Sequence, residues 1–577
     1  VSIQEVRAKV EKAYAAFQKL RTYSQEQLDA IVEAMGAAGR ANAQHLAELA
    51  VQETGYGNVK DKISKNLLNA DLLPRMLRGM KTVGLLREIP EQKIVEMGVP
   101  VGVVAAILPT TNPTSTAIYK IIIALKAGNT VVVSPHPRAK ACTCETARLL
   151  YEAAIAAGAP ADCIQCIQNA TIEGTDALMR HPRTSVILAT GGHGIVKAAY
   201  SSGKPAFGVG PGNVPVLLDA SADLADAVAK VVEGKSFDYG TVCSSEQTLV
   251  VLNQQKALAM DQLRKNGAYI CSEAQSKALA KLLIAPNWRI NANCVGQAPE
   301  KIAKMAGFEV PSGTSILVVE IGGVGKEHPL SMEKLSPVLS LLSVSGWEEQ
   351  VRGCQAILKF GGLGHTCVIH SRDEARTREF GMRMPAFRVL VNTPAPQGST
   401  GITTGVPPAM TLGCGAMAGN STSDNVGPMH LVNVKRLAYV VRTVEEAFPE
   451  SGPTAASSSS KAAPSTVGAA VERYLSRRGL RGEPVPATTA GVVDRFLTTR
   501  ILATQKSAAD CGCAVPVRVA QPMPAPAPVP VTDFVCEADV RAALQKGQKI
   551  FIGAKTIVTP AAREFAGQHD ILVLAER

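Results

Sequence analysis

The spacing of apolar residues divides the chain into regions of different predicted structure. Over residues 2–50 apolar positions recur at helical intervals, as at Val6, Val10 and Phe17, so this segment is predicted to be helical. From residue 101 the pattern changes to the continuous, β-branched run VGVVAAIL. Runs of this kind are typical of strands that are buried on both faces.

Strands and helices then alternate. The loop PTTNP (109–113) leads into the helical run TSTAIYKIIIALKA, and the strand TVVVS (130–134) follows it. A helix around 147–157, a strand near Cys163 and the strand TSVILAT (184–190) continue the alternation. This order predicts a parallel, doubly wound sheet of the α/β class. Ligands bind such sheets at the carboxyl ends of strands, where PTTNP and ATGGHG (189–194) both lie.

A second α/β region begins near residue 216. It has a helix in SADLADAVAKVVEG, the loop FDYGTVCSSEQ (237–247) and the strand TLVVL, and the pattern continues to about 420. The run MHLVNVKRLAYVV then returns as a strand. We therefore predict four parts: an N-terminal and cofactor-binding domain, a catalytic domain, a return or oligomerisation strand, and a flexible extension. Their bounds are 1–215, 216–420, 421–449 and 450–577.

The composition shifts near residue 450. A Ser/Ala/Pro linker there cannot bury a core. Two amphipathic helices are predicted after it. Their apolar faces are Val467, Val471, Tyr474 and Leu475 in one helix, and Val493, Phe496, Leu497 and Ile501 in the other. A Pro-rich spacer (521–531) precedes a small segment (539–576) whose pattern is that of folded protein.

Aromatic residues make up only 4% of the chain, so the core depends on Ala, Val, Ile and Leu. The net charge of +11 is compatible with nucleic acid, a membrane surface or an anionic ligand. Because Lys and Arg are scattered, a polyanionic cofactor explains the charge better than nucleic acid does. The sequence has neither an apolar run of membrane-spanning length nor a signal pattern, so we expect a cytosolic protein.

The 13 cysteines follow no disulfide-framework spacing and are expected to be free thiols in a reducing compartment. Cys163 and Cys166 form a C-x-x-C motif, but a second pair at metal-ligand spacing is missing. We therefore favour a structural role over zinc or redox chemistry, and predict no metal site. The same interpretation covers the pairs Cys142/Cys144 and Cys511/Cys513.

Each candidate for chemistry is ambiguous when taken alone. Cys243 lies in a polar, Gly-containing loop, as a nucleophile would, but most cysteines are structural. Asn112 ends a strand, where its amide could donate to an oxyanion, yet Asn before Pro113 is common in turns. The Gly-rich turns at 189–199 and 208–215 could admit a phosphate, or could simply be turns.

Six motifs taken together carry a resemblance. In order they are PTTNP, SPHPRAK, LATGGHGIVKAAYSSGKPAFGVGPGNVPV, FDYGTVCSSEQ, MEKLSPVLS and LGCGAMAGNSTSDNVGP. Over about residues 1–448 the chain closely resembles the CoA-acylating branch of the aldehyde dehydrogenase superfamily. The resemblance implies an aldehyde-dehydrogenase-like fold and the oxidation of an aldehyde, with NAD and CoA, to an acyl-CoA.

The resemblance also implies the roles of single residues. Cys243 matches the nucleophile, Asn112 the oxyanion-hole amide, and Glu333 the acid that holds the nicotinamide-side ribose, where the alternative is a solvated loop acid. His365 is given either a structural role or a part in handling the CoA thiol. The other positions matched to cofactor binding are Thr110, Ser134, His136, Pro137, Arg138, Gly191, Gly192, Gly194 and Gly210.

One departure from the wider superfamily decides the branch. Hydrolytic aldehyde dehydrogenases carry a general-base Glu about 34 residues before the nucleophile, which lands on Val209 here. Without that carboxylate, a thiol acceptor is favoured over water, because thiols are partly ionised at neutral pH. The alternatives are a hydrolytic enzyme that makes the free acid, and a catalytically dead scaffold, against which the set Cys243, Asn112 and Glu333 argues.

The extension carries a second resemblance. KTIVTPAARE (555–564) is similar to a short segment of bacterial microcompartment proteins, and the two amphipathic helices resemble encapsulation peptides. This implies an enzyme inside a microcompartment of the bacterial cytoplasm, with shell proteins or other encapsulated enzymes as partners. Propionaldehyde is the favoured substrate, with acetaldehyde next and sulfoacetaldehyde a third option. We expect a homo-oligomer that binds neither nucleic acid nor a membrane.

Overall fold

A computed structural model of the chain describes residues 2–448 and, with gaps, 532–574. The chain divides into two compact units, Val1–Gly452 and Pro453–Arg577, which are treated separately below. Both predicted amphipathic helices of the extension, at 467–475 and 493–501, lie outside the described residues. Among the residues that are described, helices long and apolar enough to cross a membrane are absent.

The segment 2–50 is helical as predicted, but it is divided into three helices. They are α1 (Ser2–Leu20), α2 (Gln25–Ala41) and α3 (Ala43–Thr54). The first break arises because Ser24 caps α2 in a capping box with Gln27. A further helical stretch follows, made of α4 (Val59–Leu67), η1 (Leu68–Leu72) and α5 (Leu73–Leu77).

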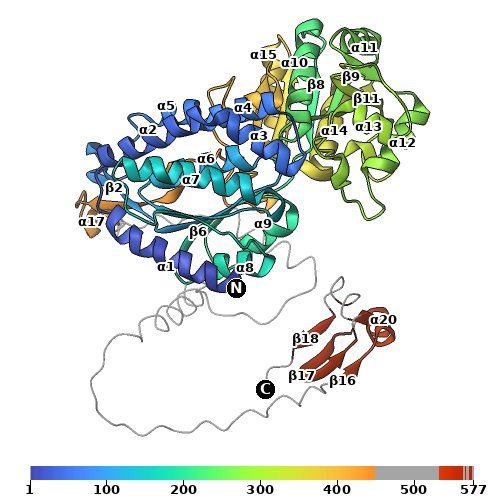
Figure 1. Ribbon diagram of the computed structural model, residues 1–577. Helices are drawn as coiled ribbons and strands as arrows, with labels where there is room; N and C mark the ends of the chain where they lie inside the picture. The colour runs from blue at the N-terminus through green and yellow to red at the C-terminus, as the bar shows by residue number, and fades with distance from the viewer. Residues whose placement is uncertain are drawn as a thin grey trace, which may run out of the picture. The chain divides into compact units, whose positions relative to one another are not determined.

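The first parallel sheet confirms the predicted α/β alternation (Figure 1). Its strands lie in the order β5-β4-β3-β6-β7. Their bounds are β3 (Val103–Ile107), β4 (Thr130–Ser134), β5 (Ile164–Cys166), β6 (Thr184–Thr190) and β7 (Ala206–Val209). The connecting helices are α6 (Pro113–Lys126), α7 (Lys140–Ala156), α8 (Ile172–Arg180) and α9 (His193–Tyr200), with the turn η3 (Pro137–Ala139) before α7.

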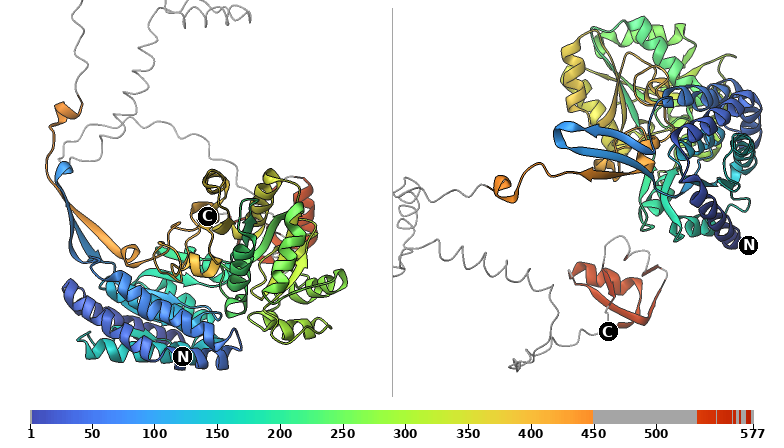
Figure 2. Two further views of the ribbon diagram at one scale, coloured as in Figure 1. Left: turned by 90° about the horizontal axis from the view of Figure 1, so that it is seen from above. Right: turned by 90° about the vertical axis from the view of Figure 1, so that its left-hand side faces the viewer.

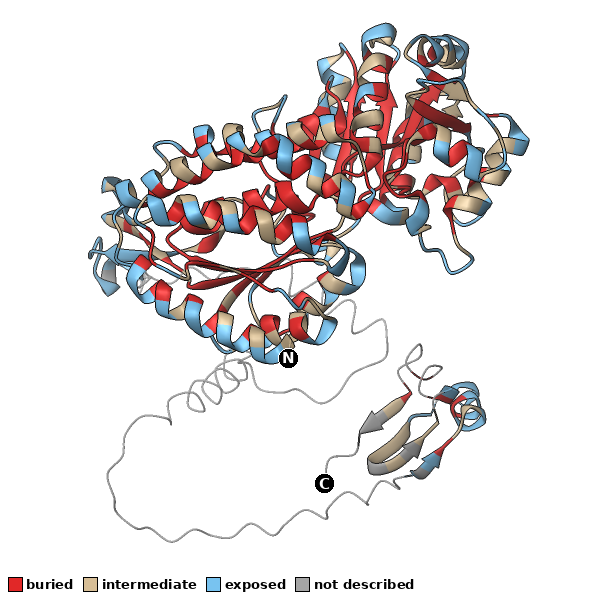
Figure 3. Cartoon of the chain, in the orientation of Figure 1, coloured by how far each residue is buried: buried red, intermediate tan, exposed pale blue. Residues whose placement is uncertain are grey.

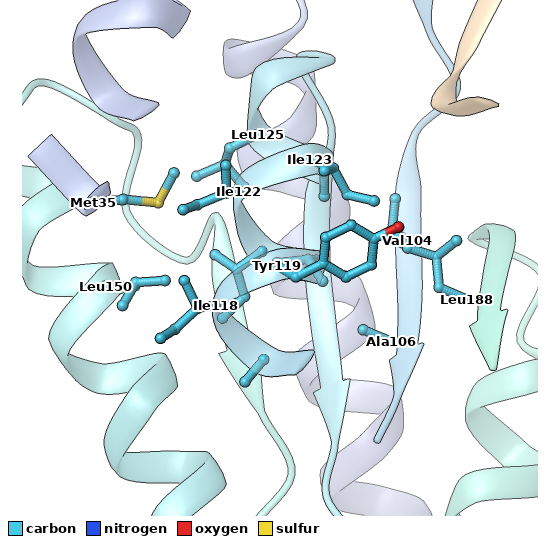
Figure 4. Packing of buried hydrophobic residues seen from close by; sticks show 14 of the residues in the cluster. Met35, Val104, Ala106, Ile118, Tyr119, Ile122, Ile123, Leu125, Leu150 and Leu188 are labelled. Atoms are coloured by element: carbon cyan, nitrogen blue, oxygen red, sulfur yellow. The ribbon is translucent and has the colours of Figure 1, made fainter. Parts of the chain in front are cut away.

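Helix α6 is buried on every side, which explains why its sequence is apolar nearly all round. All fourteen of its residues are buried. Figure 4 shows Tyr119 of α6 facing the strand residues Val104 and Leu188, while Ile122 lies towards Met35. The helix therefore lies between the sheet and an outer helical layer, whereas the apolar face of α1 covers the opposite face of the sheet.

The second sheet is larger and also parallel. Its order is β10-β11-β12-β9-β8-β13-β14. The strands are β8 (Val214–Leu218), β9 (Glu246–Leu252), β10 (Ala268–Ile270), β11 (Ile316–Glu320), β12 (Val338–Val344), β13 (Gly364–His370) and β14 (Ala386–Val391). The helices are α10 (Leu224–Ser236), α11 (Lys256–Lys265), α12 (Glu273–Leu283), α13 (Pro299–Met305), α14 (Trp347–Ile357), α15 (Glu374–Arg383) and α16 (Ala395–Ser399). In Figure 3 the strands are buried and the outer helical faces exposed.

The return strand predicted near 429–441 is β15 (Val432–Ala438). It pairs antiparallel with β2 (Ile94–Pro100), which in turn pairs with β1 (Gly84–Ile89). In Figure 2 the orange β15 runs beside this blue hairpin. Leu437 and Tyr439 are exposed there, and a short helix α17 (Val444–Ala447) follows.

The expectation that every cysteine is a free thiol is wrong for one pair. Cys144 of α7 and Cys166 of β5 form a disulfide, with their Cα atoms 5.7 Å apart. Spacing along the chain could not suggest this pair, because the partners belong to different elements that packing brings together. Cys163 is a buried free thiol, so the C-x-x-C motif is not itself a disulfide.

The second unit has a small fold of its own. Strands β16 (Thr532–Val535), β17 (Ile550–Val558) and β18 (Leu572–Leu574) form a parallel sheet in that order, with helix α20 (Glu537–Gln545) after β16. Val535, Val540 and Ile571 are among the residues of its core. The segment KTIVTPAARE begins within β17, and Ala562 from it is buried in this core.

Candidate functional site

The candidate nucleophile lies in the loop before β9, at the amino end of a strand of the second sheet. The Cys243 Sγ is 3.3 Å from the Nε2 of His365, which lies at the start of β13. Gly212 leaves room for this pair: a Cβ there would lie 2.2 Å from the Cys243 carbonyl oxygen and 3.2 Å from the His365 ring. Any larger residue at position 212 would displace one of the two.

Both members of this pair are neutral at rest. Burial raises the pKa of Cys243 to about 12, and the charge of Glu333 adds to this. Burial lowers the pKa of His365 well below its usual 6.5, and Arg388 lowers it further. The resting state is therefore a thiol beside a neutral imidazole, and not a thiolate–imidazolium pair.

A chain of hydrogen bonds orients the imidazole. Arg388 donates through Nε to Thr366 Oγ1 at 3.3 Å and through Nη2 to the His365 carbonyl at 2.8 Å. Thr366 Oγ1 lies 2.9 Å from His365 Nδ1. The Thr366 hydroxyl oxygen has two lone pairs, so it can accept both from Arg388 Nε and from an N–H at His365 Nδ1. In the tautomer with the proton on Nδ1, the bare Nε2 faces the Cys243 sulfur and can accept the thiol proton.

Asn112 lies across the site from the nucleophile loop. It occupies the N-cap position of α6, just after β3, and is 9% exposed. Its Nδ2 donates to the Thr241 carbonyl at 3.4 Å, two residues before Cys243, and to Thr111 Oγ1 at 3.0 Å. The fold thus brings the carboxyl end of one sheet against the amino end of the other.

Glu333 is not a solvated loop acid. Its side chain is buried, and its Oε1 accepts a hydrogen bond from the Gly212 N–H at 3.1 Å. Burial raises its pKa to about 8. Nearby Glu246, at the start of β9, also has its pKa raised to about 8 by burial, while burial lowers that of Lys235 to about 7. Glu333 acts on the cysteine directly, and Lys235 interacts with both Glu246 and Glu333 behind it.

Apart from Glu333 and His365, the residues predicted to bind a cofactor lie at or just after the carboxyl ends of adjacent strands of the first sheet. Thr110 follows β3, Ser134 ends β4, and β3 pairs with both β4 and β6. Gly191, Gly192 and Gly194 follow β6 at the start of α9, and Gly210 follows β7. This row matches the place where doubly wound sheets hold nucleotides.

Two of these residues also contact other parts of the protein. Ser134 Oγ lies 3.1 Å from Thr175 Oγ1. Arg138 Nη1 donates to the Tyr56 hydroxyl at 3.1 Å, and its guanidinium lies over the Tyr56 ring. His136, half-buried, accepts from the Arg138 N–H through Nδ1, with the exposed Pro137 between them.

Position 209 holds no carboxylate. Val209 is 2% exposed and belongs to the apolar core of the first sheet. Among the described residues, groups of three or more His, Cys, Asp or Glu that could hold a metal ion are absent.

Comparison with known proteins decides the family. Residues 2–270 match the aldehyde dehydrogenase family. The crystal structure of an acetylating aldehyde dehydrogenase from Geobacillus thermoglucosidasius is 49% identical and superimposes with a TM-score of 0.76, covering 77% of this chain and 98% of that one. The chain belongs to the aldehyde dehydrogenase family.

Two further relatives place it among aldehyde dehydrogenases. The bifunctional aldehyde-alcohol dehydrogenase of Escherichia coli K12 is 42% identical over 442 residues, which are 76% of this chain and 50% of that protein. The chain thus spans about half the length of this curated relative. A propionaldehyde dehydrogenase from the fucose utilisation bacterial microcompartment of Clostridium phytofermentans is 28% identical, with a TM-score of 0.69, and covers 75% of this chain and 97% of that one.

Sequence reasoning missed several residues at or behind this candidate site. Lys62 and Lys65 are 2% exposed, and Asp238 is fully buried. Two lysines three apart in a helix have the pattern of a solvated face, so the sequence held no signal for their burial. Gly212 and Arg388 were missed as well, because only their three-dimensional neighbours give them a role.

Proposed function

We propose that the chain is a CoA-acylating aldehyde dehydrogenase that oxidises a short aliphatic aldehyde with NAD to an acyl-CoA. One observation carries the proposal: the Cys243 sulfur lies 3.3 Å from the His365 Nε2, and the Asn112 amide donates to the Thr241 carbonyl two residues before Cys243. At the position of the hydrolytic general base the chain has the buried Val209. The acetylating relative at 49% identity supports the same reaction.

The residues at the carboxyl edge of the first sheet fit a dinucleotide. The Thr190 hydroxyl, at the end of β6, is buried and has no hydrogen-bond partner within the described protein, so it can serve a ligand. Gly191 and Gly192 follow it, where backbone can approach a phosphate closely. When bound, NAD accepts hydride and CoA supplies the acceptor thiol. We assign Glu333, His136 and Arg138 to the ribose and adenosine parts of these ligands.

Cys243 must lose its proton to attack the aldehyde carbonyl. Its thiol pKa of about 12 leaves few thiolates at neutral pH, and the nearest base is the neutral His365. We assign His365 the role of accepting this proton as the carbon–sulfur bond forms. Once it has released this proton, the same imidazole faces the place where the CoA thiol must attack the acyl-enzyme, which is the second of the two roles weighed for it.

Asn112 and the Cys243 backbone N–H are assigned to the oxyanion. The negative charge that develops on the aldehyde oxygen needs donors that are fixed in advance, each worth roughly 3–4 kcal/mol. Asn112 already points its Nδ2 towards the nucleophile loop. Once hydride has left the carbon, Cys243 carries the acyl group as a thioester, which is poised for exchange with another thiol.

The substrate and setting are the finer part of the proposal. We favour propionaldehyde, with acetaldehyde and then sulfoacetaldehyde as alternatives, within a microcompartment of the bacterial cytoplasm. Support comes from KTIVTPAARE in the second unit and from the microcompartment propionaldehyde dehydrogenase among the relatives. Shell proteins or other encapsulated enzymes are the proposed partners of the extension, and we propose a homo-oligomer.

A spectrophotometric assay of C2–C4 aldehydes with NAD, run with and without CoA, tests this function. We expect sustained cofactor reduction and acyl-CoA product only when CoA is present, fastest with propionaldehyde. Equal steady turnover without CoA would favour the hydrolytic alternative that makes the free acid. Failure to reduce the cofactor with any of these aldehydes would favour the scaffold alternative.

A further inference from the structure

A buried ion cluster lies directly behind the candidate oxyanion site. Asp238 is fully buried in the loop before Cys243. Its Oδ2 forms an ion pair with Nζ of Lys62 in α4, at a distance of 3.1 Å. Lys65, one helical turn further along α4, forms an ion pair with the same oxygen. Thr241 Oγ1 also donates to Oδ2, at 2.5 Å. The cluster thus joins an N-terminal helix to the nucleophile loop.

The two lysines differ in one contact. Lys62 donates to the Thr111 carbonyl at 3.0 Å and does not contact the side chain of Asn112. Lys65 donates to the Asn112 Oδ1. An ammonium group has three donors and no acceptor, so it can face only the oxygen of an amide. Lys65 therefore fixes which way the Asn112 side chain is turned.

The opposite end of the amide points to the nucleophile loop. With its oxygen held by Lys65, the Asn112 Nδ2 faces the Thr241 carbonyl. A cation on the oxygen also withdraws electron density from the nitrogen, which makes the N–H hydrogens stronger donors. Both effects act on the atom that meets the developing oxyanion.

The loop conformation holds Asp238 in place for this purpose. Asp238, Tyr239 and Gly240 have φ angles of 48°, 52° and 72°, three successive residues in the left-handed region. L-residues adopt this region only when their surroundings compel it. Asp238 N–H donates to Asp61 Oδ2 at 2.7 Å, and its Oδ1 accepts from the Asn58 N–H at 2.9 Å. A Cβ at Gly57 would lie 1.9 Å from that Oδ1, so only glycine fits there.

We propose that Lys65 is a positioning residue for the oxyanion step: anchored by Asp238, it orients and polarises the Asn112 amide towards the reacting carbonyl. The proposal rests on the proposed aldehyde dehydrogenase function. In this role Lys65 does not contact the substrate and acts only through Asn112. Lys62, which shares the helix, the burial and the carboxylate partner, does not contact the Asn112 side chain and is the natural control.

A double-mutant cycle on the full chain tests this. The readout is the rate constant of the first burst of NAD reduction with propionaldehyde, in wild type, Lys65→Met, Asn112→Ala and the double variant. We expect Lys65→Met to lower this rate constant by about 10–100-fold, less than the roughly 100–1,000-fold effect of losing an oxyanion donor itself. In the Asn112→Ala background the same change should have an effect of less than about 2-fold. The KM for NAD should stay unchanged.

Lys62→Met separates positioning from general loss of the ion cluster. Its effect on the burst should be of similar size with and without Asn112. Equal losses from Lys65→Met in both backgrounds would overturn the proposal. If Lys65→Met does not fold, the variant Lys65→Met/Asp238→Asn replaces it in the cycle. This variant removes one positive and one negative charge, so the net charge of the buried cluster is unchanged.

Alkylation of Cys243 by iodoacetamide checks that the nucleophile is intact in each variant, and its rate should change little in Lys65→Met. A wild type that gives no burst and no acyl-CoA would instead refute the proposed function, and the role of Lys65 with it. An active wild type with an additive Lys65 effect refutes the role of Lys65 alone.

Discussion

The Nε2 of His365 lies 3.3 Å from the Sγ of Cys243, although 122 residues separate them in the chain. His365 is fully buried and Cys243 half-buried, and Arg388 and Thr366 fix the imidazole from behind. In the proposed mechanism the thiol stays protonated until an aldehyde arrives, and the adjacent imidazole then takes its proton. This contact distinguishes Cys243 from the other cysteines of the described chain.

Replacing the nucleophile should abolish the reaction. Cys243→Ala removes the group proposed to carry the acyl chain, so acyl-CoA formation should fall to background while the melting temperature changes little. Cys294→Ala is the matched control, since Cys294 is fully buried in the same unit and is not part of this site. Comparable turnover in Cys243→Ala would refute the assignment and direct attention to Cys271, Cys294 or Cys414.

Omitting CoA should expose the acyl-enzyme. With saturating aldehyde and NAD, we expect a burst of about one reduced cofactor per active site, followed by slow turnover. The slow phase reflects the absence of a carboxylate at position 209. Rapid-mixing absorbance measures the burst, and mass spectrometry of the quenched protein should find the acyl group on the peptide that contains Cys243. A linear trace without a burst would mean that hydrolysis is not rate-limiting.

The reactivity of the thiol should follow its raised pKa. Thiolate increases with pH, and a pKa of about 12 means that the alkylation rate of Cys243 by iodoacetamide should keep rising from pH 6 to 10 without a plateau. His365→Ala should lower the burst rate and leave the direction of this profile unchanged. A plateau near neutral pH in the wild type would show a thiolate–imidazolium pair at rest, in conflict with the neutral pair described here.

The ion cluster should contribute strongly to stability. Asp238→Ala leaves two buried lysines without their carboxylate and should cost about 3–5 kcal/mol of unfolding free energy. Asp226→Ala, which breaks the surface pair with Lys230, should cost less than about 1 kcal/mol. Urea unfolding followed by circular dichroism measures both. Equal losses of unfolding free energy in the two variants would show that the buried Asp238 cluster contributes no more to stability than an exposed ion pair does.

The pH dependence of this contribution has a definite sign. Burial raises the pKa of Asp238, but Lys62 and Lys65 more than offset this and hold it below its usual 3.8. The stabilisation is therefore present at neutral pH and is lost as pH falls below 3.8. The difference in stability between wild type and Asp238→Ala should accordingly shrink only in strong acid.

Truncation should separate catalysis from targeting. A chain that ends at residue 452 keeps the first compact unit and every proposed site residue, so its kcat/KM should equal that of the full chain. A fluorescent protein fused to residues 464–505 should colocalise with shells in cells that make them, through modest and multivalent contacts. A diffuse fusion, together with an unchanged Phe496→Asp enzyme, would leave KTIVTPAARE as the next candidate.

The sequence by itself determined the parallel α/β architecture, and it supplied Asn112 and Cys243 as candidates for the site. The short, β-branched apolar runs at 103–107 and 184–190 predict buried strands in a chain where strands alternate with helices, and local propensity and turn chemistry set their ends. The ordered motifs around Asn112 and Cys243 pointed to the same family that the comparisons show. These features depend on residues that are close together in the sequence, so they can be predicted without the three-dimensional structure.

Only the tertiary structure decided which residues work together. The contact between Cys243 and His365, the hold of Lys65 on Asn112, and the disulfide between Cys144 and Cys166 all join distant elements. Lysines at helical spacing look the same whether they face water or a buried carboxylate. Burial removes water as a competing partner, and it is this loss of solvent that converts Lys65 and Asp238 from ordinary charges into a fixed electrostatic support.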